Sequence, residues 1–478
     1  MRSDRAAGVP VPSKDTTGTP APSAGKAHGT QDNGPDGGPG RKAGPKADLK
    51  ADRRAHRRSV TATVVGNFVE SFDWLAYGLF APLLATHFFP SSNPVTSLIG
   101  AFAVLGIGVL VRPLGGVLLG RLADRRGRRP ALMLAISLMT AGSVLIAVTP
   151  TYGTIGILAP LVLLLARVAQ GVAAGGEWPA ATAYLMEVAP PKRKCLYGSF
   201  FSLTTAAGAF AASLLGGSLT ALLGPDAMAA WGWRVPFLVG GLFGAVLLVM
   251  RRQLTETEVF RREAGGSAAR GSVRHVLTAH RRQVVISVLF ISGMATVGGT
   301  WTSVVPAMGQ RLAEPGVMFW AVVCATSVMM ALNVPIGLLA DRLGPRRFLL
   351  GASAVFAVVG SYTFLTVQGT FTSLLLAYGS GVFFLVSATT TLPSILSDLF
   401  PAENRALGMG LPNAVTSALL GGVAPGLATY LGDRGASGWF IGGVMTAVLL
   451  TWPAALLLSR TPAPAPAVLG RSSLDLTK

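Results

Sequence analysis

The chain has 478 residues, of which 51% are hydrophobic and 13% charged, and its mean hydropathy is +0.54. Because soluble domains carry about 25% charged residues, this composition excludes an ordinary water-soluble fold and indicates that most of the chain lies in lipid. A net charge of +19 would suggest nucleic acid as the partner of a soluble protein. Here the basic residues gather in the N-terminal tail and in short loops, the positive-inside pattern of membrane proteins, so no nucleic-acid partner is expected.

Residues 1–58 are rich in Gly, Pro, Ala and charged residues and contain no apolar segment. Such a composition cannot bury a core, so we predict a disordered cytoplasmic tail. It also lacks the apolar core that a signal peptide needs. The basic end of this tail, "RRAHRR", is suited to contact with anionic lipid.

About twelve apolar runs follow, most of them close to the roughly 20 residues that span the hydrocarbon core. The sequence therefore predicts an all-α membrane protein with twelve transmembrane helices. The fourth run is long enough to consist of two pieces. The approximate spans are 60–85, 97–120, 131–149, 154–188, 197–223, 232–250, 283–308, 316–340, 348–367, 371–398, 405–431 and 437–459.

The loops between these runs alternate in charge. Basic loops such as "RLADRRGRRP" and "DRLGPRR" fall on one side, and uncharged loops such as "TPTYGT" and "VQGTFT" fall on the other. An even number of spans then places both termini in the cytoplasm. The predicted organisation is a six-helix half at 59–250, a cytoplasmic linker at 251–282, a second six-helix half at 283–460 and a cytoplasmic tail at 461–478.

One loop sequence occurs twice. "GRLADRRGRR" starts at Gly120 after the second run, and "GLLADRLGPRR" starts at Gly337 after the eighth. Two like-oriented halves are one plan of secondary transporters, with the substrate near the membrane midplane between them. Within the loop, glycine allows close helix packing, and aspartate caps a helix start or pairs with arginine. Gly127 and Gly344 permit a tight turn.

The repeated loop is interpreted as a latch that holds the cytoplasmic side closed. The alternative is that it only anchors the topology through its basic residues. Its presence in both halves favours the latch. The gating residues predicted on this basis are Asp124, Arg125, Arg128, Arg129, Asp341, Arg342, Arg346 and Arg347.

The first run carries two carboxylates in "GNFVESFDWLAYG". Glu70, Asp73 and Tyr77 share one helical face with Gly66. Charged groups at this depth must face protein or water rather than lipid. Two carboxylates one turn apart and partly removed from water favour a proton on one of them, which is what proton coupling requires. The alternative is a structural pair that neutralises arginines and joins helices.

Arginines at comparable depth follow in the next runs. Arg112 precedes Pro113, and Arg167 shares a helical face with Gln170 and Glu177. At membrane depth the first six runs thus hold three carboxylates and two arginines, enough for two ion pairs with one carboxylate left to carry a proton. Glu70, Asp73 and Glu177 are the predicted proton-coupling residues.

The second half has no comparable charges within its runs. It offers Trp301 and Asn413 as contacts for a substrate. The alternative for the aromatic residue is packing or lipid contact, which is favoured for any single one, and the alternative for the amide is a helix–helix hydrogen bond. The predicted substrate-binding residues are Tyr77, Arg112, Arg167, Gln170, Trp301 and Asn413. With no Cys/His cluster, nucleophile–base pair or phosphate-binding loop in the sequence, we expect no metal, no cofactor and no enzyme activity.

The repeated loop resembles the signature of the major facilitator superfamily, and further segments over residues 60–460 resemble its metabolite:proton symporters. These segments are "GNFVESFDWLAYG", "RPLGG" (112–116), "RVAQGVAAGGE" (167–177), "WGWRVPF" (231–237), "LTETEVF" (254–260) and "DLFPAENRALGMGLPNAV" (398–415). The family usually has Gly, Pro and Glu where Cys195, Glu258 and Asp398 stand. The resemblance implies a twelve-helix symporter of the cytoplasmic membrane, and it implicates Glu70 and Asp73 in proton coupling and substrate handling.

The expected partners are protons, membrane lipid and a small polar metabolite such as an organic acid or a proline- or betaine-like solute. Three carboxylates around two arginines leave little spare positive charge, which favours a monocarboxylate, zwitterion or betaine over a dicarboxylate. Two alternatives stay open: proton-driven efflux of a drug or secondary metabolite, and a sensor or scaffold that transports nothing. The sequence leaves the oligomeric state open, and a monomer is compatible with it.

Overall fold

The computed structural model describes residues 45–126, 128–176, 182, 185–186, 189–252, 273–401 and 405–459. All regular secondary structure in these ranges is helical, as predicted. The N-terminal helices are α1 (Pro45–Phe88), α2 (Pro94–Leu110), α3 (Arg112–Arg126), α4 (Arg128–Val148), α5 (Tyr152–Ile155), α6 (Leu158–Gly175), α8 (Lys194–Ala230), η1 (Gly232–Arg234) and α9 (Val235–Arg252).

The C-terminal helices include two single π-helical turns, η2 and η4. In chain order they are α11 (Val273–Ala279), α12 (Arg281–Gly299), η2 (Thr300–Val304), α13 (Val305–Leu312), α14 (Val317–Leu343), α15 (Pro345–Leu365), α16 (Phe371–Ser397), α17 (Arg405–Thr416), η4 (Ser417–Gly421), α18 (Ala424–Asp433), α19 (Ser437–Leu449) and α20 (Thr451–Ser459).

Eleven helices in the described ranges are long and apolar enough to cross a membrane. They correspond to the second to twelfth predicted runs, and α1 contains the first. Near the start of the fourth run, the short α5 and α6 are separated at Gly156, whose φ of 58° suits glycine. Helix also reaches into two segments that the composition assigned to tail and linker, since α1 begins at Pro45 and α11 covers Val273–Ala279.

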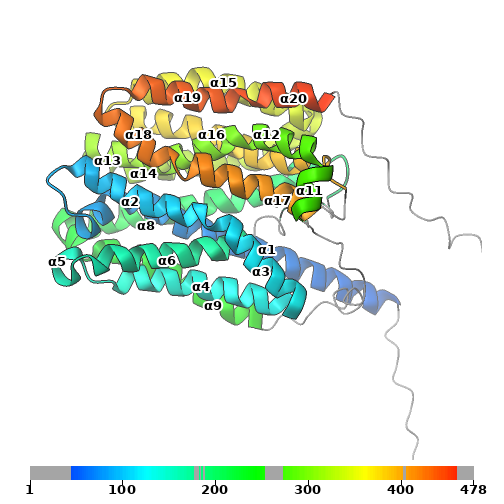
Figure 1. Cartoon of the computed structure of the whole chain (residues 1–478), viewed down its shortest axis with the longest axis horizontal. Coiled ribbons are helices and arrows are strands. Elements are labelled where there is room, and N and C mark those ends of the chain that lie inside the picture. The colour runs from blue at the N-terminus through cyan, green and yellow to red at the C-terminus, as the bar shows by residue number, and fades with distance from the viewer. Residues whose placement is uncertain are drawn as a thin grey trace, which may run out of the picture. The chain divides into compact units, whose positions relative to one another are not determined.

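Figure 1 shows the helices of the N-terminal set, drawn blue to green, beside those of the C-terminal set, drawn green to red. The seam between the sets is formed where α8 packs on α14 and α16 and where α2 packs on α18. Glycine brings backbones together there. A Cβ added at Gly106 would collide with the carbonyl of Gly422, and one added at Gly198 would collide with that of Thr390.

Glycines also explain how the "RPLGG" and "RVAQGVAAGGE" segments pack. A Cβ at Gly175 would collide with the carbonyl of Arg112, and a Cβ at Gly171 with that of Gly108. The backbones of α2 and α3 therefore lie directly against α6, as small residues permit between membrane helices. This contact holds Arg112 and Arg167 beside the same face of α1.

Candidate functional site

A cavity lies among the N-terminal helices α1, α2, α3, α4 and α6, with about 310 Å³ of space between atoms, part of it open solvent. It brings together most of the ionisable groups that the sequence placed at membrane depth. Its lining residues are Glu70, Asp73, Trp74, Gly108, Arg112, Met139, Arg167, Gln170, Gly171 and Ala174.

Glu70 and Arg112 form an ion pair at the more exposed part of the cavity. Arg112 Nη2 lies 3.3 Å from Glu70 Oε1, and the two side chains are 25% and 15% exposed, respectively. The guanidinium also lies 4.9 Å above the ring centre of Trp74, within the range of a cation–π contact. Arg112 is thus held by two residues of α1.

Asp73 is buried, with 2% of its surface exposed. The Ser143 hydroxyl on α4 donates a hydrogen bond of 2.6 Å to its Oδ2, while Oδ1 has no hydrogen-bond partner among the described residues. On the opposite side lies Gly240 of α9, where an added Cβ would collide with Oδ1. Neither ion pair found in the described part of the chain includes Asp73.

Arg167 is equally buried, at 3% exposure. Its guanidinium carbon lies 3.8 Å above the ring centre of Tyr77, and the Tyr77 hydroxyl donates a 2.9 Å hydrogen bond to the carbonyl of Ala101. Within the described ranges, Nε and Nη2 of Arg167 have no hydrogen-bond partner. The arginine is therefore fixed by an aromatic face, with donors still available.

Gln170 lies one turn beyond Arg167 on α6. Its Nε2 donates a 2.9 Å hydrogen bond to Ser143 Oγ, and its Oε1 is buried with no partner in the described chain. A hydrogen-bonded chain thus runs from Gln170 through Ser143 to Asp73. Sequence reasoning missed Ser143 and Gly240; the available signal was a serine within the apolar 131–149 run and a glycine within the 232–250 run.

The expectation of two ion pairs is only partly met. Glu70 and Arg112 are paired, whereas Asp73 and Arg167 form no ion pair among the described residues. Glu177, the third predicted carboxylate, lies outside the described residues. The cavity therefore contains one ion pair, Glu70–Arg112, and two buried groups outside any ion pair of the described residues, the Asp73 carboxylate and the Arg167 guanidinium.

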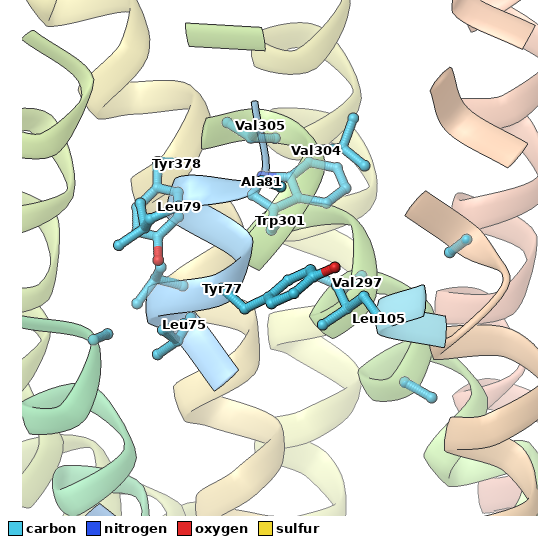
Figure 2. Close-up of a cluster of buried hydrophobic side chains, with 14 of the residues drawn as sticks. Leu75, Tyr77, Leu79, Ala81, Leu105, Val297, Trp301, Val304, Val305 and Tyr378 are labelled. Atoms are coloured by element: carbon cyan, nitrogen blue, oxygen red, sulfur yellow. The ribbon is translucent and has the colours of Figure 1, made fainter. Parts of the chain in front are cut away.

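Trp301 and Asn413 do not line this cavity. Trp301 is fully buried, and its indole nitrogen donates a 2.8 Å hydrogen bond to the carbonyl of Ala377. Figure 2 shows it among apolar side chains of α12, η2 and α13, with Tyr77 and Leu105 approaching from α1 and α2. Tyr77 thus has Arg167 over its ring and belongs to the apolar contact between the two helix sets.

The second copy of the repeated loop joins the two helix sets at one end of the seam. Asp341 on α14 accepts hydrogen bonds from the backbone nitrogens of Cys195 and Leu196, at 2.9 and 3.0 Å, and so caps the start of α8. Lys194 forms an ion pair with Asp398 beside it. The predicted cap by this aspartate is confirmed, and so is the tight turn at Gly344, where φ is 88°.

The other predicted gating residues make no such connection in the described chain. Arg342 and Arg347 are exposed, and Arg346 is half-buried. The side chains of the first copy, Asp124, Arg125, Arg128 and Arg129, lie outside the described residues.

Contacts also cross the opposite end of the seam. Gln310 Nε2 on α13 donates a 2.6 Å hydrogen bond to the carbonyl of Leu79 on α1, and Arg311 Nη2 donates a 3.3 Å hydrogen bond to that of Pro94 at the start of α2. Contacts between the two helix sets are therefore present at both ends of the seam.

Asp341→Ala is expected to loosen the α8–α14 contact. Loss of a helix-capping side chain costs about 1 kcal/mol, so opening at this end should become roughly fivefold more frequent. Cys195 reports it, because this thiol is buried at the contact and the second cysteine, Cys324, is exposed. The measurement is the rate of maleimide labelling of Cys195 in a Cys324→Ser background, taken at saturating maleimide, where opening of the contact and not the reactivity of the thiol sets the rate.

The matched control for this experiment is Asp433→Ala, an aspartate at the exposed end of α18. It should leave the labelling rate of Cys195 unchanged. Equal rates in wild type and Asp341→Ala would show that the cap does not hold the seam.

Comparison with known proteins assigns the chain to a family. The profile of the Major Facilitator Superfamily matches residues 63–329 and 300–476. The citrate-proton symporter of Salmonella typhi is 33% identical over 385 residues, covering 79% of this chain and 88% of its own. The alpha-ketoglutarate permease of Escherichia coli (strain K12) is 34% identical over 400 residues, covering 83% and 92%. A putative proline/betaine transporter of Staphylococcus aureus (strain COL) is 30% identical over 378 residues, covering 77% and 81%.

Solved structures with the same fold are more distant in sequence. A D-xylose-proton symporter superposes with a TM-score of 0.64 at 16% identity, covering 85% of this chain and 98% of its own. The human organic anion transporter MFSD10 gives 0.56 at 16% identity, covering 84% and 99%. These likenesses concern the fold alone.

The resemblance found in the sequence motifs is confirmed by the family profile and by the curated relatives. The helical architecture agrees with the twelve-helix fold of that family. The chain belongs to the Major Facilitator Superfamily, and it is a multi-pass membrane transporter rather than an enzyme.

Proposed function

We propose that the chain is a proton-coupled symporter of a small metabolite that bears a carboxylate. Arg167 binds the substrate carboxylate, and Asp73 carries the transported proton. The observation that supports this assignment is the pair of buried, separate charges at one cavity: a guanidinium with two unpartnered nitrogens, and a carboxylate outside any ion pair of the described residues.

The case for a carboxylate substrate rests on Arg167. A buried cation is costly unless an anion and hydrogen bonds compensate it. Guanidinium binds carboxylate through two parallel hydrogen bonds, and Nε and Nη2 are adjacent donors of the kind such binding uses. The Tyr77 ring covers one face of the group, which leaves the edge for a ligand.

The case for Asp73 as the proton carrier rests on the absence of an ion pair to it among the described residues. Glu70 is neutralised by Arg112 at 3.3 Å, so adding a proton there would break an ion pair. Asp73 has one hydroxyl donor and one unpartnered oxygen in the described structure. A carboxylate in such surroundings changes its charge by taking up a proton. A proton bound there also compensates the negative charge that a substrate brings in.

The relatives support the same chemistry. Citrate, α-ketoglutarate, proline and betaine differ in size and charge, but each carries a carboxylate, and the first relative is by name a proton symporter. One arginine without an ion pair in the described chain suffices for one carboxylate. We therefore place a single carboxylate at Arg167 and leave the rest of the solute to the space beside it.

The orientation follows from the basic loops. Lys194, Arg342 and Arg347 lie at the end of the bundle where α8 begins and α14 ends. The positive-inside pattern assigns this end to the cytoplasm, so both termini are cytoplasmic in the proposed arrangement. The membrane is then the cytoplasmic membrane, and the Asp341 cap belongs to the inner gate.

The test is uptake into proteoliposomes with an imposed proton gradient. Labelled citrate, α-ketoglutarate, proline and betaine are offered one at a time. We expect at least one to accumulate, and its accumulation to collapse when a protonophore removes the gradient. Absence of gradient-dependent flux for all four would overturn the proposal. Gradient-driven export of a drug or secondary metabolite would then support an efflux transporter. Binding of a solute without flux would support a sensor or scaffold.

A further inference from the structure

Ser143 stands between Asp73, the proposed proton site, and Gln170, and both of these residues line the cavity. It is fully buried in α4, and three polar groups meet its Oγ. Asp73 Oδ2 lies at 2.6 Å and the Met139 carbonyl at 3.2 Å, both as acceptors, and Gln170 Nε2 donates from 2.9 Å. A hydroxyl has one hydrogen to donate and two lone pairs, so it can serve only one of the two acceptors at a time.

The two acceptors match the two protonation states of Asp73. An ionised carboxylate only accepts hydrogen bonds, so Ser143 donates to Asp73 and accepts from Gln170. A protonated Asp73 has an O–H to donate. Ser143 then accepts from Asp73 and turns its own hydrogen to the Met139 carbonyl. All heavy atoms can stay in place during this exchange.

Reorientation of the Ser143 hydroxyl changes the strength of the hydrogen bond that Gln170 donates to it. When Ser143 donates to an ionised carboxylate, hydrogen bonds in the chain polarise and strengthen one another. When Asp73 is protonated, its O–H and the Gln170 amide share the same serine oxygen, and the bond from Gln170 weakens. The Gln170 amide lines the cavity beside Arg167, where its nitrogen can then donate to a substrate carboxylate.

We propose that Ser143 is the positioning residue that couples the proton on Asp73 to substrate binding through Gln170. The inference rests on the proposed symport function and adds the link between its two sites. Protonation of Asp73 should therefore raise the affinity for the substrate, as symport requires, since it increases the number of hydrogen-bond donors offered to the substrate. The groups around Asp73 are Glu70 and Tyr77 on α1, Arg112 on α3, Ser143 on α4, Arg167 and Gln170 on α6, and Gly240 on α9.

The first test needs no substrate. Infrared difference spectra between acid and alkaline pH are recorded on the full-length protein, and the carbonyl band of protonated Asp73 is identified by its loss in Asp73→Asn. In Ser143→Ala this band should move to higher wavenumber, because the carboxyl loses its partner. Ser213→Ala is the matched control: Ser213 on α8 is also fully buried, but its hydroxyl has no partner in the described structure.

The second test measures coupling as the change in substrate affinity with pH. Binding of labelled citrate, α-ketoglutarate, proline and betaine is measured at acid and alkaline pH. Couplings between two sites are typically 5- to 150-fold, and we expect wild type and Ser213→Ala to lie within that range. Ser143→Ala should retain binding but show less than about threefold dependence on pH. Ser143→Cys, with a similar size and a weaker donor, should fall between them.

The outcomes separate the two proposals. If wild type binds none of the four solutes, the carboxylate-symporter proposal fails, and the infrared band alone decides whether Ser143 contacts the proton site. A band that stays at its wild-type position in Ser143→Ala overturns the inference. So does a wild-type pH dependence of affinity in that variant.

Discussion

Asp73→Asn is expected to abolish proton-driven accumulation while preserving exchange of labelled for unlabelled substrate. A gradient of one pH unit supplies about 1.4 kcal/mol for one proton, which sustains roughly tenfold accumulation. Without a proton carrier the substrate can only equilibrate, so the ratio should fall to about one. Asparagine keeps the size of the side chain and can still accept from Ser143, which lies 2.6 Å from Oδ2 in the wild type. The measurement compares the accumulation ratio with the rate of exchange in the same proteoliposomes.

Gly240→Ala disturbs the same carboxylate from the opposite side. A methyl group there would collide with Asp73 Oδ1, so coupling should fall although no ionisable group has been changed. Gly426→Ala is the matched control, because nothing lies within 4 Å of the added carbon.

Full accumulation in Asp73→Asn would contradict the first prediction. Asp73 would then not carry the proton, and Glu70 and Glu177 would be the remaining candidates.

The sequence was sufficient for the main features of the fold and for part of the site. Run lengths predict the helices because membrane thickness sets how many residues a span needs. The 3.6-residue period predicts that Glu70, Asp73 and Tyr77 share a face. The doubled loop predicts that Asp341 either caps a helix start or pairs with an arginine, and the structure shows the cap.

The pairing within the site depends on three-dimensional placement and could not be predicted from spacing. Which carboxylate meets Arg112 depends on how closely the backbone of α3 approaches that of α6, where a Cβ at Gly175 would collide with the carbonyl of Arg112. The role of Ser143 depends on α4 packing beside α1, which no local pattern specifies. Trp301 was expected at the substrate because aromatic residues suit ligands, but its indole is taken up by packing within the C-terminal helices.

Arg167→Met is expected to abolish uptake of the carboxylate substrate without destabilising the protein. Hydrogen bonds to charged groups are worth about 1.5–3 kcal/mol each, so loss of two should weaken binding by at least about 100-fold. Arg167→Lys should remain defective, because an ammonium group lacks the two-pronged geometry of guanidinium. Binding is measured with the solute that wild type accumulates, and folding is measured by thermal unfolding.

The stability of the variant distinguishes a binding residue from a structural one. Replacing Arg167 by methionine removes the desolvation cost of a buried cation, but also its contact with the Tyr77 ring and its attraction to Asp73. Because these effects oppose one another, the Tm without substrate should stay close to that of wild type. Saturating substrate at 100 times Kd should add about 2.7 kcal/mol to the stability of wild type and nothing to that of the variant.

Arg434 is the matched control for this experiment, because it also lies over a tyrosine ring, 4.5 Å from the centre of Tyr430, but on the exposed surface. Arg434→Met should bind substrate as wild type does. If Arg167→Met unfolds at a lower temperature and keeps its substrate-induced stabilisation, the guanidinium serves helix packing, and the substrate carboxylate must bind elsewhere.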